Sequence, residues 1–261
     1  MCLVRLLPAG LSARQTAGLF ARSKVAGRQY KRKNLRQRLA ESAHESKQDK
    51  DVAEFFVVSK SCGDMDTAVA LPERADVIII GGGPGGLTCA RALARAGAQV
   101  LLVERKPCFG RKVCAGGITA SGLLPRMPPS LIERSFSLQQ LCSPWQGIRI
   151  KEPQAMVATV SRERLGQWMV QQAQEAGAIL RSNVHALAPT DHGLLLRDAA
   201  GKVRELFCEH LVGADGARSL VRRGLGLSSR LSIGLNAMLP MEREQMEWHL
   251  NSRLFVSGYG W

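Results

Sequence analysis

The stretch that decides the fold is Ala75–Lys106, which reads ADVIIIGGGPGGLTCARALARAGAQVLLVERK. Asp76–Ile80 contains an uninterrupted apolar run and Val100–Val103 is another, and such runs are typical of parallel strands that are buried on both faces. Between them, Pro84 suits the first position of a helix, because its φ is already helical and its missing N–H is not needed there. Gly97 is a typical residue to end that helix. This order of strand, glycine-rich turn, helix and strand predicts an α/β fold with a parallel sheet.

The glycine-rich turn has the spacing G-x-G-x-x-G at Gly81, Gly83 and Gly86. In this spacing the first glycine permits a tight turn, the second lets a pyrophosphate approach the backbone, and the third lets helix and strand pack closely. The helix N-terminus offers N–H groups and partial positive charge to the phosphates. Glu104 follows the second strand, where an acid accepts hydrogen bonds from ribose hydroxyls. The pattern predicts a dinucleotide site. The competing interpretation is a glycine-rich turn of an unrelated α/β protein, with Glu104 merely solvated.

The net charge of +14 belongs mainly to one end of the chain. Residues 1–40 hold ten Lys and Arg and no acid, so the remaining residues hold 26 Lys and Arg against 22 acids. The folded part therefore does not require a nucleic-acid partner. Residues 1–71 are interpreted as a basic, disordered extension or a mis-assigned start. Two alternatives remain open, an organellar transit peptide and an arm that contacts anionic lipid or nucleic acid.

The cysteines and histidines indicate whether disulfides or a metal site are to be expected. The seven cysteines are an odd number without any C-x-x-C pair, which favours reduced thiols in a cytosol-like compartment over a disulfide framework. The five histidines have no ligand spacing, so no metal site is predicted. No apolar run approaches the roughly 18–20 residues that a membrane-spanning helix needs. A cytoplasmic protein is expected, or an organellar one if residues 1–40 are a transit peptide.

A second motif lies at 208–227, CEHLVGADGARSLVRRGLGL, after a hairpin predicted at 193–208. It resembles the Asp-Gly motif of flavoproteins of the para-hydroxybenzoate hydroxylase-like class. That resemblance implies that Asp215 and Gly216 contact FAD and that Arg222 supports the turn. The alternative is a plain strand–turn–helix in which Asp215 caps the helix.

Further features point to the same class. The seventeen residues between Gly86 and Glu104 resemble the spacing of FAD-dependent enzymes. On this resemblance Pro84 and Arg105 join the cofactor-contacting residues. A strand, an arginine and an amphipathic helix at 157–180 are also similar to this class, which implies that Arg162 faces the cofactor, with Arg164 as the alternative.

Two short segments resemble the geranylgeranyl reductases within this class. The first is RKVCAGGITASGLL at 111–124, in which the family's Lys-x-Cys-x-Gly-Gly stretch lies beside the flavin. The matching cofactor residues are Lys112, Gly116 and Gly117, together with Cys114. The second is Gly258–Trp261, which gives the first half of a Tyr-x-Trp-x-Phe-Pro segment that lines a lipid tunnel. Tyr259 and Trp261 are thus predicted to contact substrate. The missing second half is interpreted as C-terminal truncation, which puts catalysis by this exact chain in doubt.

The resemblance implies a reductase that reduces carbon–carbon double bonds of a prenyl lipid. FAD would be the cofactor, NAD(P)H the electron donor, and peripheral membrane contact would deliver the apolar substrate. Cys114 and Tyr259 are the candidate proton donors. Two alternatives remain: an FAD-dependent aromatic hydroxylase or halogenase, and a non-catalytic, truncated flavin-binding fragment.

The predicted architecture is a Rossmann-type FAD-binding domain with a parallel sheet, plus an incomplete antiparallel-sheet substrate domain. The FAD domain is expected at 72–117 and 160–228, and the substrate domain at 118–159 and 229–261.

Overall fold

The chain contains two compact units in the computed structural model. The structure describes residues 3–6, 70–110, 112–122, 124–231, 233–237, 244–255 and 258–261. Unit 1 comprises residues 1–110 and 166–231, and unit 2 comprises residues 111–165 and 232–261. Compact units need not be separately folding domains, so the domain boundaries expected from the sequence remain a prediction.

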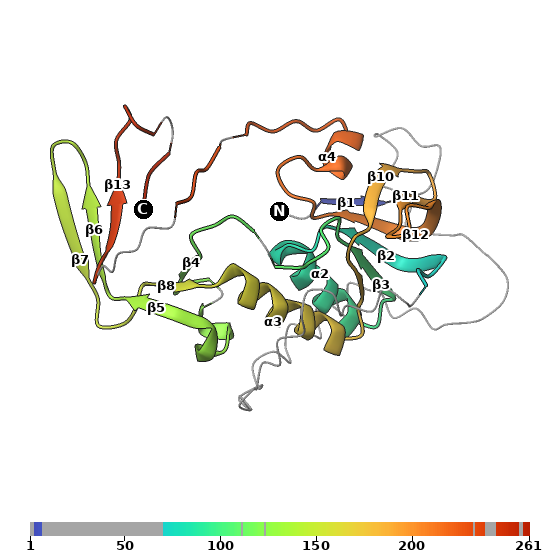
Figure 1. The fold of residues 1–261 in the computed structure, drawn as a ribbon, viewed down its shortest axis with the longest axis horizontal. Helices are drawn as coiled ribbons and strands as arrows, with labels where there is room; N and C mark the ends of the chain where they lie inside the picture. The colour runs from blue at the N-terminus through green and yellow to red at the C-terminus, as the bar shows by residue number, and fades with distance from the viewer. Residues whose placement is uncertain are drawn as a thin grey trace, which may run out of the picture. The chain divides into compact units, whose positions relative to one another are not determined.

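Unit 1 is built on one mixed sheet (Figure 1). In sheet order its strands are β10 (His185–Pro189), β11 (Gly193–Arg197), β12 (Val203–Gly213), β2 (Arg74–Ile80), β3 (Val100–Val103) and β9 (Ile179–Arg181). The run from β12 to β9 is parallel, whereas β10 and β11 are antiparallel to their neighbours. The parallel sheet expected from the sequence is confirmed. Residues 3–6 of the N-terminal extension form β1 (Leu3–Leu6), which pairs antiparallel with β12, so disorder is wrong for this segment. The interpretation of the extension otherwise concerns residues 1–2 and 7–69, which lie outside the described residues.

The first strand, helix and strand follow the sequence pattern closely. From Val77 onward β2 is apolar and buried, as is the whole of β3, and these strands contribute to the core of the sheet. The helix α2 (Pro84–Arg95) begins at the predicted proline and contacts both strands. Gly97 stops it with a φ of 84°, and the N–H of Ala98 donates to the carbonyl of Leu93 at 3.1 Å. Such a left-handed residue with a long backward bond is a common helix ending.

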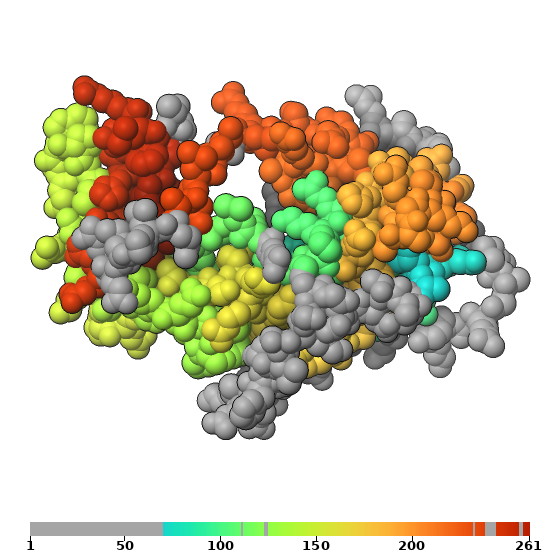
Figure 2. Space-filling model, in the orientation of Figure 1, coloured from blue at the N-terminus to red at the C-terminus, as the bar shows by residue number. Residues whose placement is uncertain are grey.

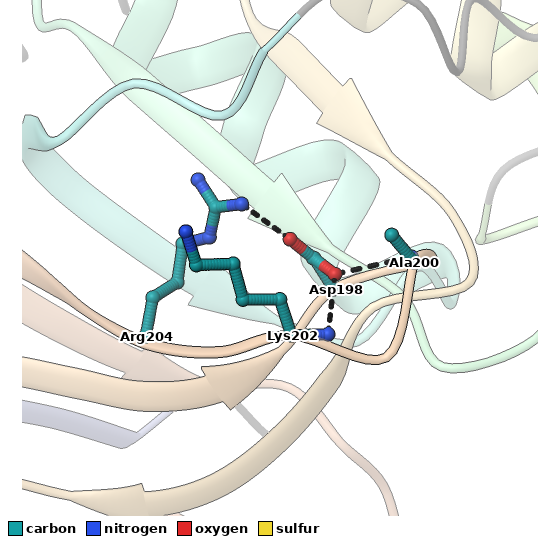
Figure 3. Close-up of polar contacts among 4 residues, drawn as sticks. All are labelled: Asp198, Ala200, Lys202 and Arg204. Atoms are coloured by element: carbon teal, nitrogen blue, oxygen red, sulfur yellow. Dashed lines mark hydrogen bonds and ion pairs between the residues drawn. The ribbon is translucent and has the colours of Figure 1, made fainter.

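The hairpin β11–β12 closes through an aspartate-centred turn (Figure 3). The Asp198 carboxylate accepts the backbone N–H groups of Ala200 and Lys202 at 3.0 and 2.9 Å and pairs with Arg204 at 2.5 Å. Burial acts to raise the pKa of Asp198. The hydrogen bond from Lys202, the guanidinium of Arg204 and the N–H of Ala200 outweigh it and hold this pKa below its ordinary value of 3.8.

Unit 2 contains two small sheets. One has the order β4 (Gly117–Thr119), β8 (Val157–Val160), β5 (Ile132–Phe136) and is antiparallel. The other has the order β13 (Met246–His249), β6 (Leu138–Cys142), β7 (Gly147–Lys151). Its β6–β7 pair is antiparallel as expected, but β13 runs parallel to β6.

The remaining helices of the described residues are short, with one exception. They are the single turns η1 (Leu124–Arg126) and η2 (Pro129–Leu131), the five-residue α4 (Leu220–Gly224) and the longer α3 (Arg162–Glu175). The helix α3 follows β8 and leads to β9, as its sequence pattern predicts.

The cysteines correct one expectation. Cys89, Cys114, Cys142 and Cys208 are outside any disulfide, and burial raises the pKa of Cys208 to about 11, which disfavours its thiolate. Cys108, however, is disulfide-bonded. Reduced thiols were expected from the sequence, and this is wrong for Cys108, because cysteine spacing alone does not show which cysteines the fold brings together.

Candidate functional site

The glycine-rich turn lies at the carboxyl end of β2, with its backbone packed against a second turn. A Cβ atom on Gly81 would lie 2.5 Å from the carbonyl oxygen of Ala214, and one on Gly86 would lie 1.9 Å from that of Gly81. Gly81 also has a φ of 108°, which side chains rarely tolerate. These two glycines therefore shape the turn from within.

Gly83 differs from these two, because a Cβ atom there would meet nothing within 4 Å. Its φ of −77° and ψ of 176° suit any residue, and it occupies the N-cap of α2 without a side-chain cap. The first turn of this 12-residue helix contains no acid. The space beside Gly83 is thus open to a ligand, and the positive end of the helix dipole favours an anionic one.

Glu104 lies beside the same turn. One carboxylate oxygen accepts the N–H of Gly82 at 2.7 Å, and the other accepts the N–H of Lys106 at 3.0 Å. These bonds fix the carboxylate at the carboxyl end of β3 and leave it lone pairs for ribose hydroxyls. The neighbouring Arg105 is exposed.

Sequence reasoning missed the reason for the middle glycine of GGG. A Cβ atom on Gly82 would lie 2.4 Å from the ring of the buried Phe109. Only the position of Phe109 in the fold reveals this constraint.

The Asp-Gly turn follows β12, the next strand in the sheet. Its start is tied to the glycine-rich turn, because the N–H of Ala214 donates to the carbonyl of Ile80 at 2.8 Å. One oxygen of Asp215 accepts the N–H of Leu220 at 2.5 Å, while the other, Oδ1, is buried without a hydrogen-bond partner. Buried carboxylate oxygens without a hydrogen-bond partner are rare, and a bound ligand can supply the missing donor. Gly216 has a φ of 81°, and a Cβ atom there would meet nothing within 4 Å.

The helix after this turn is capped by Ser219, whose hydroxyl accepts the N–H of Arg222 at 3.1 Å. The guanidinium of Arg222 donates to the carbonyl of Ala217, so this arginine does support the turn. Ser219 thus occupies the N-cap position of this helix, and Asp215 also caps it by accepting the N–H of its first residue, Leu220.

Unit 2 brings together the two segments that resemble geranylgeranyl reductases. Gly116 has a φ of 86° and is packed so closely that a Cβ atom would lie 2.3 Å from the carbonyl oxygen of Val160. Its neighbour Gly117 lies under the indole of Trp261, and a Cβ atom there would lie 2.8 Å from the ring. Lys112 and Cys114, from the same segment, are exposed.

An aromatic cluster surrounds the end of this segment. The ring centroid of Trp248 lies 5.4 Å from that of Tyr259 and 5.8 Å from that of Trp261. The Trp248 indole donates to the side chain of Gln139 at 2.7 Å, which fixes its orientation. Tyr259 and Trp261 are 56% and 44% exposed, so the cluster presents an apolar surface. Trp248 was not predicted, and only its alternation within MEWHL hints at a strand residue.

The two arginines near the start of α3 differ in their contacts. Arg164 donates to the carbonyl of Ser130 at 2.8 Å, which is a structural use. Arg162 is the first residue of the helix and half-buried. Its predicted contact with the cofactor remains a prediction.

The predicted site residues thus form two groups. The group in unit 1 comprises Gly81, Gly83, Pro84, Gly86, Glu104, Arg105, Asp215 and Gly216. The group in unit 2 comprises Lys112, Cys114, Gly116, Gly117, Arg162, Tyr259 and Trp261.

The group in unit 1 fits a dinucleotide. Ligands of parallel α/β sheets bind beyond the carboxyl ends of the strands, which is where both turns and Glu104 lie. Gly83 leaves room for a pyrophosphate. The buried Oδ1 of Asp215 has no hydrogen-bond partner, so it can accept a hydrogen bond from a ligand. The fold and this site define the class as a dinucleotide-binding protein of the Rossmann type.

Comparison with known proteins narrows the class. The family profile described as FAD dependent oxidoreductase matches residues 76–175, and the FAD binding domain profile matches residues 129–249. Digeranylgeranylglycerophospholipid reductase 2 of Methanothermobacter thermautotrophicus is 31% identical over 209 residues, which cover 72% of this chain and 53% of that protein. The uncharacterized protein in the nifH2 5′ region of Methanosarcina barkeri is 30% identical over 173 residues, which cover 60% of this chain and 91% of that protein.

Among solved structures, a geranylgeranyl bacteriochlorophyll reductase-like protein from Thermoplasma acidophilum has the same fold. Its TM-score is 0.58 at 22% identity, covering 69% of this chain and 51% of that chain.

This chain belongs to the FAD-dependent oxidoreductases. Its resemblance to the geranylgeranyl reductases is confirmed by the named relatives, and FAD is the cofactor that the matched profiles specify. The chain spans about half the length of the named reductase and of the structural relative.

Proposed function

We propose that this chain serves an FAD-dependent reductase that reduces carbon–carbon double bonds in prenyl chains, with NAD(P)H as the electron donor. The observation that supports this most is the packing of Gly117 under Trp261. It joins the two segments that resemble geranylgeranyl reductases. The names of two relatives, both digeranylgeranylglycerophospholipid reductases, support the same substrate class.

The group in unit 1 would hold the cofactor. The backbone at Gly81, Gly83 and Gly86 would accommodate the pyrophosphate, with Pro84 beginning the helix behind it. Glu104 and Arg105 would contact the adenosine half, and Asp215 and Gly216 would contact the ribityl side. When bound, FAD supplies hydride chemistry, while the protein orients it and tunes its surroundings.

The group in unit 2 would serve the substrate and the flavin ring. The exposed faces of Tyr259 and Trp261 offer aromatic surface to a prenyl chain, as apolar pockets do for such ligands. Lys112, Gly116, Gly117 and Arg162 are the proposed cofactor contacts from this unit.

Saturating a double bond also needs a proton at the second carbon. The hydroxyl of Tyr259 and the thiol of Cys114 are the candidate donors, and both residues are exposed.

A product analysis tests this proposal. The chain, reconstituted with FAD, is given NADH or NADPH and either a geranylgeranyl lipid or a phenol. A reductase yields a lipid that has gained two hydrogens for each double bond reduced. A phenol that has gained an oxygen atom would instead favour the aromatic hydroxylase, and flavin binding without turnover of either substrate would favour a non-catalytic flavin-binding protein.

Variants then separate the roles of the two proposed donors. Tyr259→Phe retains the aromatic ring and removes the proton, so a loss of turnover with unchanged substrate binding identifies Tyr259 as the donor. Cys114→Ala is the matched variant for the thiol, because it also removes the proton. If neither change lowers turnover, both assignments are wrong.

Access to a prenyl substrate would require contact with a membrane surface. Within the part of the chain that the structure describes, no helix is long and apolar enough to cross a membrane. Peripheral contact is the form that we propose.

A further inference from the structure

The hairpin β6–β7 of unit 2 (Figure 1) closes through a hydrogen-bonded turn that contains an exposed tryptophan. The Ser143 hydroxyl accepts the N–H groups of Trp145 and Gln146 at 3.3 and 3.0 Å, and the N–H of Ser143 donates to the carbonyl of Gln146 at 2.8 Å. Trp145 lies at the tip and is 85% exposed. These hydrogen bonds lie within the turn and hold its backbone.

The strand behind this tip is amphipathic and exposed along its whole length. Ile148 and Ile150 point to one face of β7, while Arg149 and Lys151 alternate with them on the other. Ile148 is 55% exposed, although its cross-strand partner is the apolar Leu141. In the sheet as described, β7 is an edge strand, so its outer side is open (Figure 2).

The charge of the hairpin has one sign. Residues 138–151 contain Arg149 and Lys151 but no Asp or Glu. Among the residues that the structure describes, neither cation forms an ion pair with a carboxylate. Tryptophan is enriched where proteins meet the bilayer interface, and Lys and Arg are attracted to anionic headgroups. A surface with both features can insert its tryptophan at the bilayer interface and attract anionic headgroups with its cations.

We propose that the hairpin Leu138–Lys151 is the surface with which the protein docks on an anionic lipid bilayer, with Trp145 at headgroup depth. A strand added to the edge of β7 would cover the strand and leave the tip exposed, whereas a bilayer covers the tip. This inference deepens the proposed function, because a prenyl substrate resides in a membrane. Its test measures binding and not turnover, so either can fail alone.

Quenching of tryptophan fluorescence by brominated lipid tests the docking surface. Vesicles of phosphatidylcholine, alone or mixed with phosphatidylglycerol, carry bromine on their acyl chains. The complete chain is used, since residues 1–40 are basic but contain no tryptophan, so electrostatic binding by them does not produce quenching. We expect strong quenching by the anionic vesicles, most of which Trp145→Ala removes.

Affinities for the anionic vesicles provide the second readout. Trp145→Ala should weaken binding about tenfold, because it removes a large apolar side chain from the interface. Arg149→Gln with Lys151→Gln should weaken it by a similar factor. The matched controls are Arg126→Gln with Arg253→Gln, which removes the same charge elsewhere in unit 2, and Leu254→Ala, which removes another exposed apolar side chain. Both controls should bind like the wild type.

Three outcomes overturn the proposal. One is equal quenching in the wild type and Trp145→Ala. Another is vesicle binding that the control variants weaken as much as the hairpin variants do. The third is a dimer in sedimentation that Trp145→Ala converts to a monomer, which would assign the hairpin to a second copy of the chain.

Discussion

Alanine substitutions at Gly83 and Gly86 should separate cofactor binding from folding. At Gly86 an added Cβ atom would lie 1.9 Å from a backbone oxygen, whereas ordinary contact begins at 3.4 Å, so helix and turn must separate by about 1.5 Å. Overpacking of this kind costs about 1–3 kcal/mol. The better helix propensity of alanine returns at most about 1 kcal/mol. We expect Gly86→Ala to lower the free energy of unfolding of the apoprotein by about 1–2 kcal/mol.

Gly83→Ala should instead leave the apoprotein nearly unchanged. The site is open, and its backbone angles suit alanine. Alanine is a poorer N-cap than glycine, but it also lowers the entropy of the unfolded chain, and each effect is about 0.5–1 kcal/mol with opposite sign. The new methyl group does occupy the space that a pyrophosphate needs. We expect FAD affinity to fall at least about tenfold, which corresponds to about 1.4 kcal/mol.

Two measurements on the same preparations test this contrast. Urea unfolding of the apoproteins gives stability, and quenching of FAD fluorescence gives affinity. Gly224→Ala is the matched control, because its Cβ atom would only touch Pro189 at 3.5 Å. The reasoning is refuted if Gly83→Ala binds FAD as tightly as the wild type, or if Gly86→Ala is as stable as Gly224→Ala.

Three further variants test individual contacts. Gly117→Ala places a methyl group 2.8 Å from the Trp261 indole, so the ring should move into solvent and tryptophan emission should shift to the red; an unchanged spectrum contradicts the packing. Asp198→Asn removes a carboxylate whose pKa in the folded protein lies below its ordinary value of 3.8. The carboxylate therefore stabilises the fold fully above about pH 4, and this stabilisation is lost as the pH falls through the pKa of the folded state. The thermal midpoint of the wild type should therefore fall more steeply than that of the variant below about pH 4, and parallel curves would be evidence against the interaction with Arg204. Ser219→Ala should lower the free energy of unfolding by about 1 kcal/mol through loss of the helix cap, while Ser219→Thr should retain most of it; equal losses would show that the cap is unimportant.

The parts of the fold that the sequence predicted share a local cause. The buried strands β2 and β3 are apolar runs, and α2 is delimited by a proline and a glycine whose backbone preferences act within a few residues. The hairpin β11–β12 follows from two strand-forming runs around a short turn. Such signals need no knowledge of distant residues.

The features that the sequence did not predict depend on contacts between distant segments. The parallel pairing of β13 with β6 joins residues more than a hundred positions apart, and it places Trp248 between Tyr259 and Trp261. The tight fit of Gly82 against Phe109 is a further case. The same limit applies to the site, where motifs indicated the residue types but not that one oxygen of Asp215 is buried without a partner.

The measurement that bears most directly on the flavin site is the ratio of bound FAD to protein after the complete chain is equilibrated with excess FAD and freed of unbound ligand. We predict one FAD per chain in the wild type and a clearly lower ratio in Asp215→Ala, which lacks the buried oxygen. A wild-type chain that is folded by circular dichroism and retains no FAD would contradict the assignment of this site.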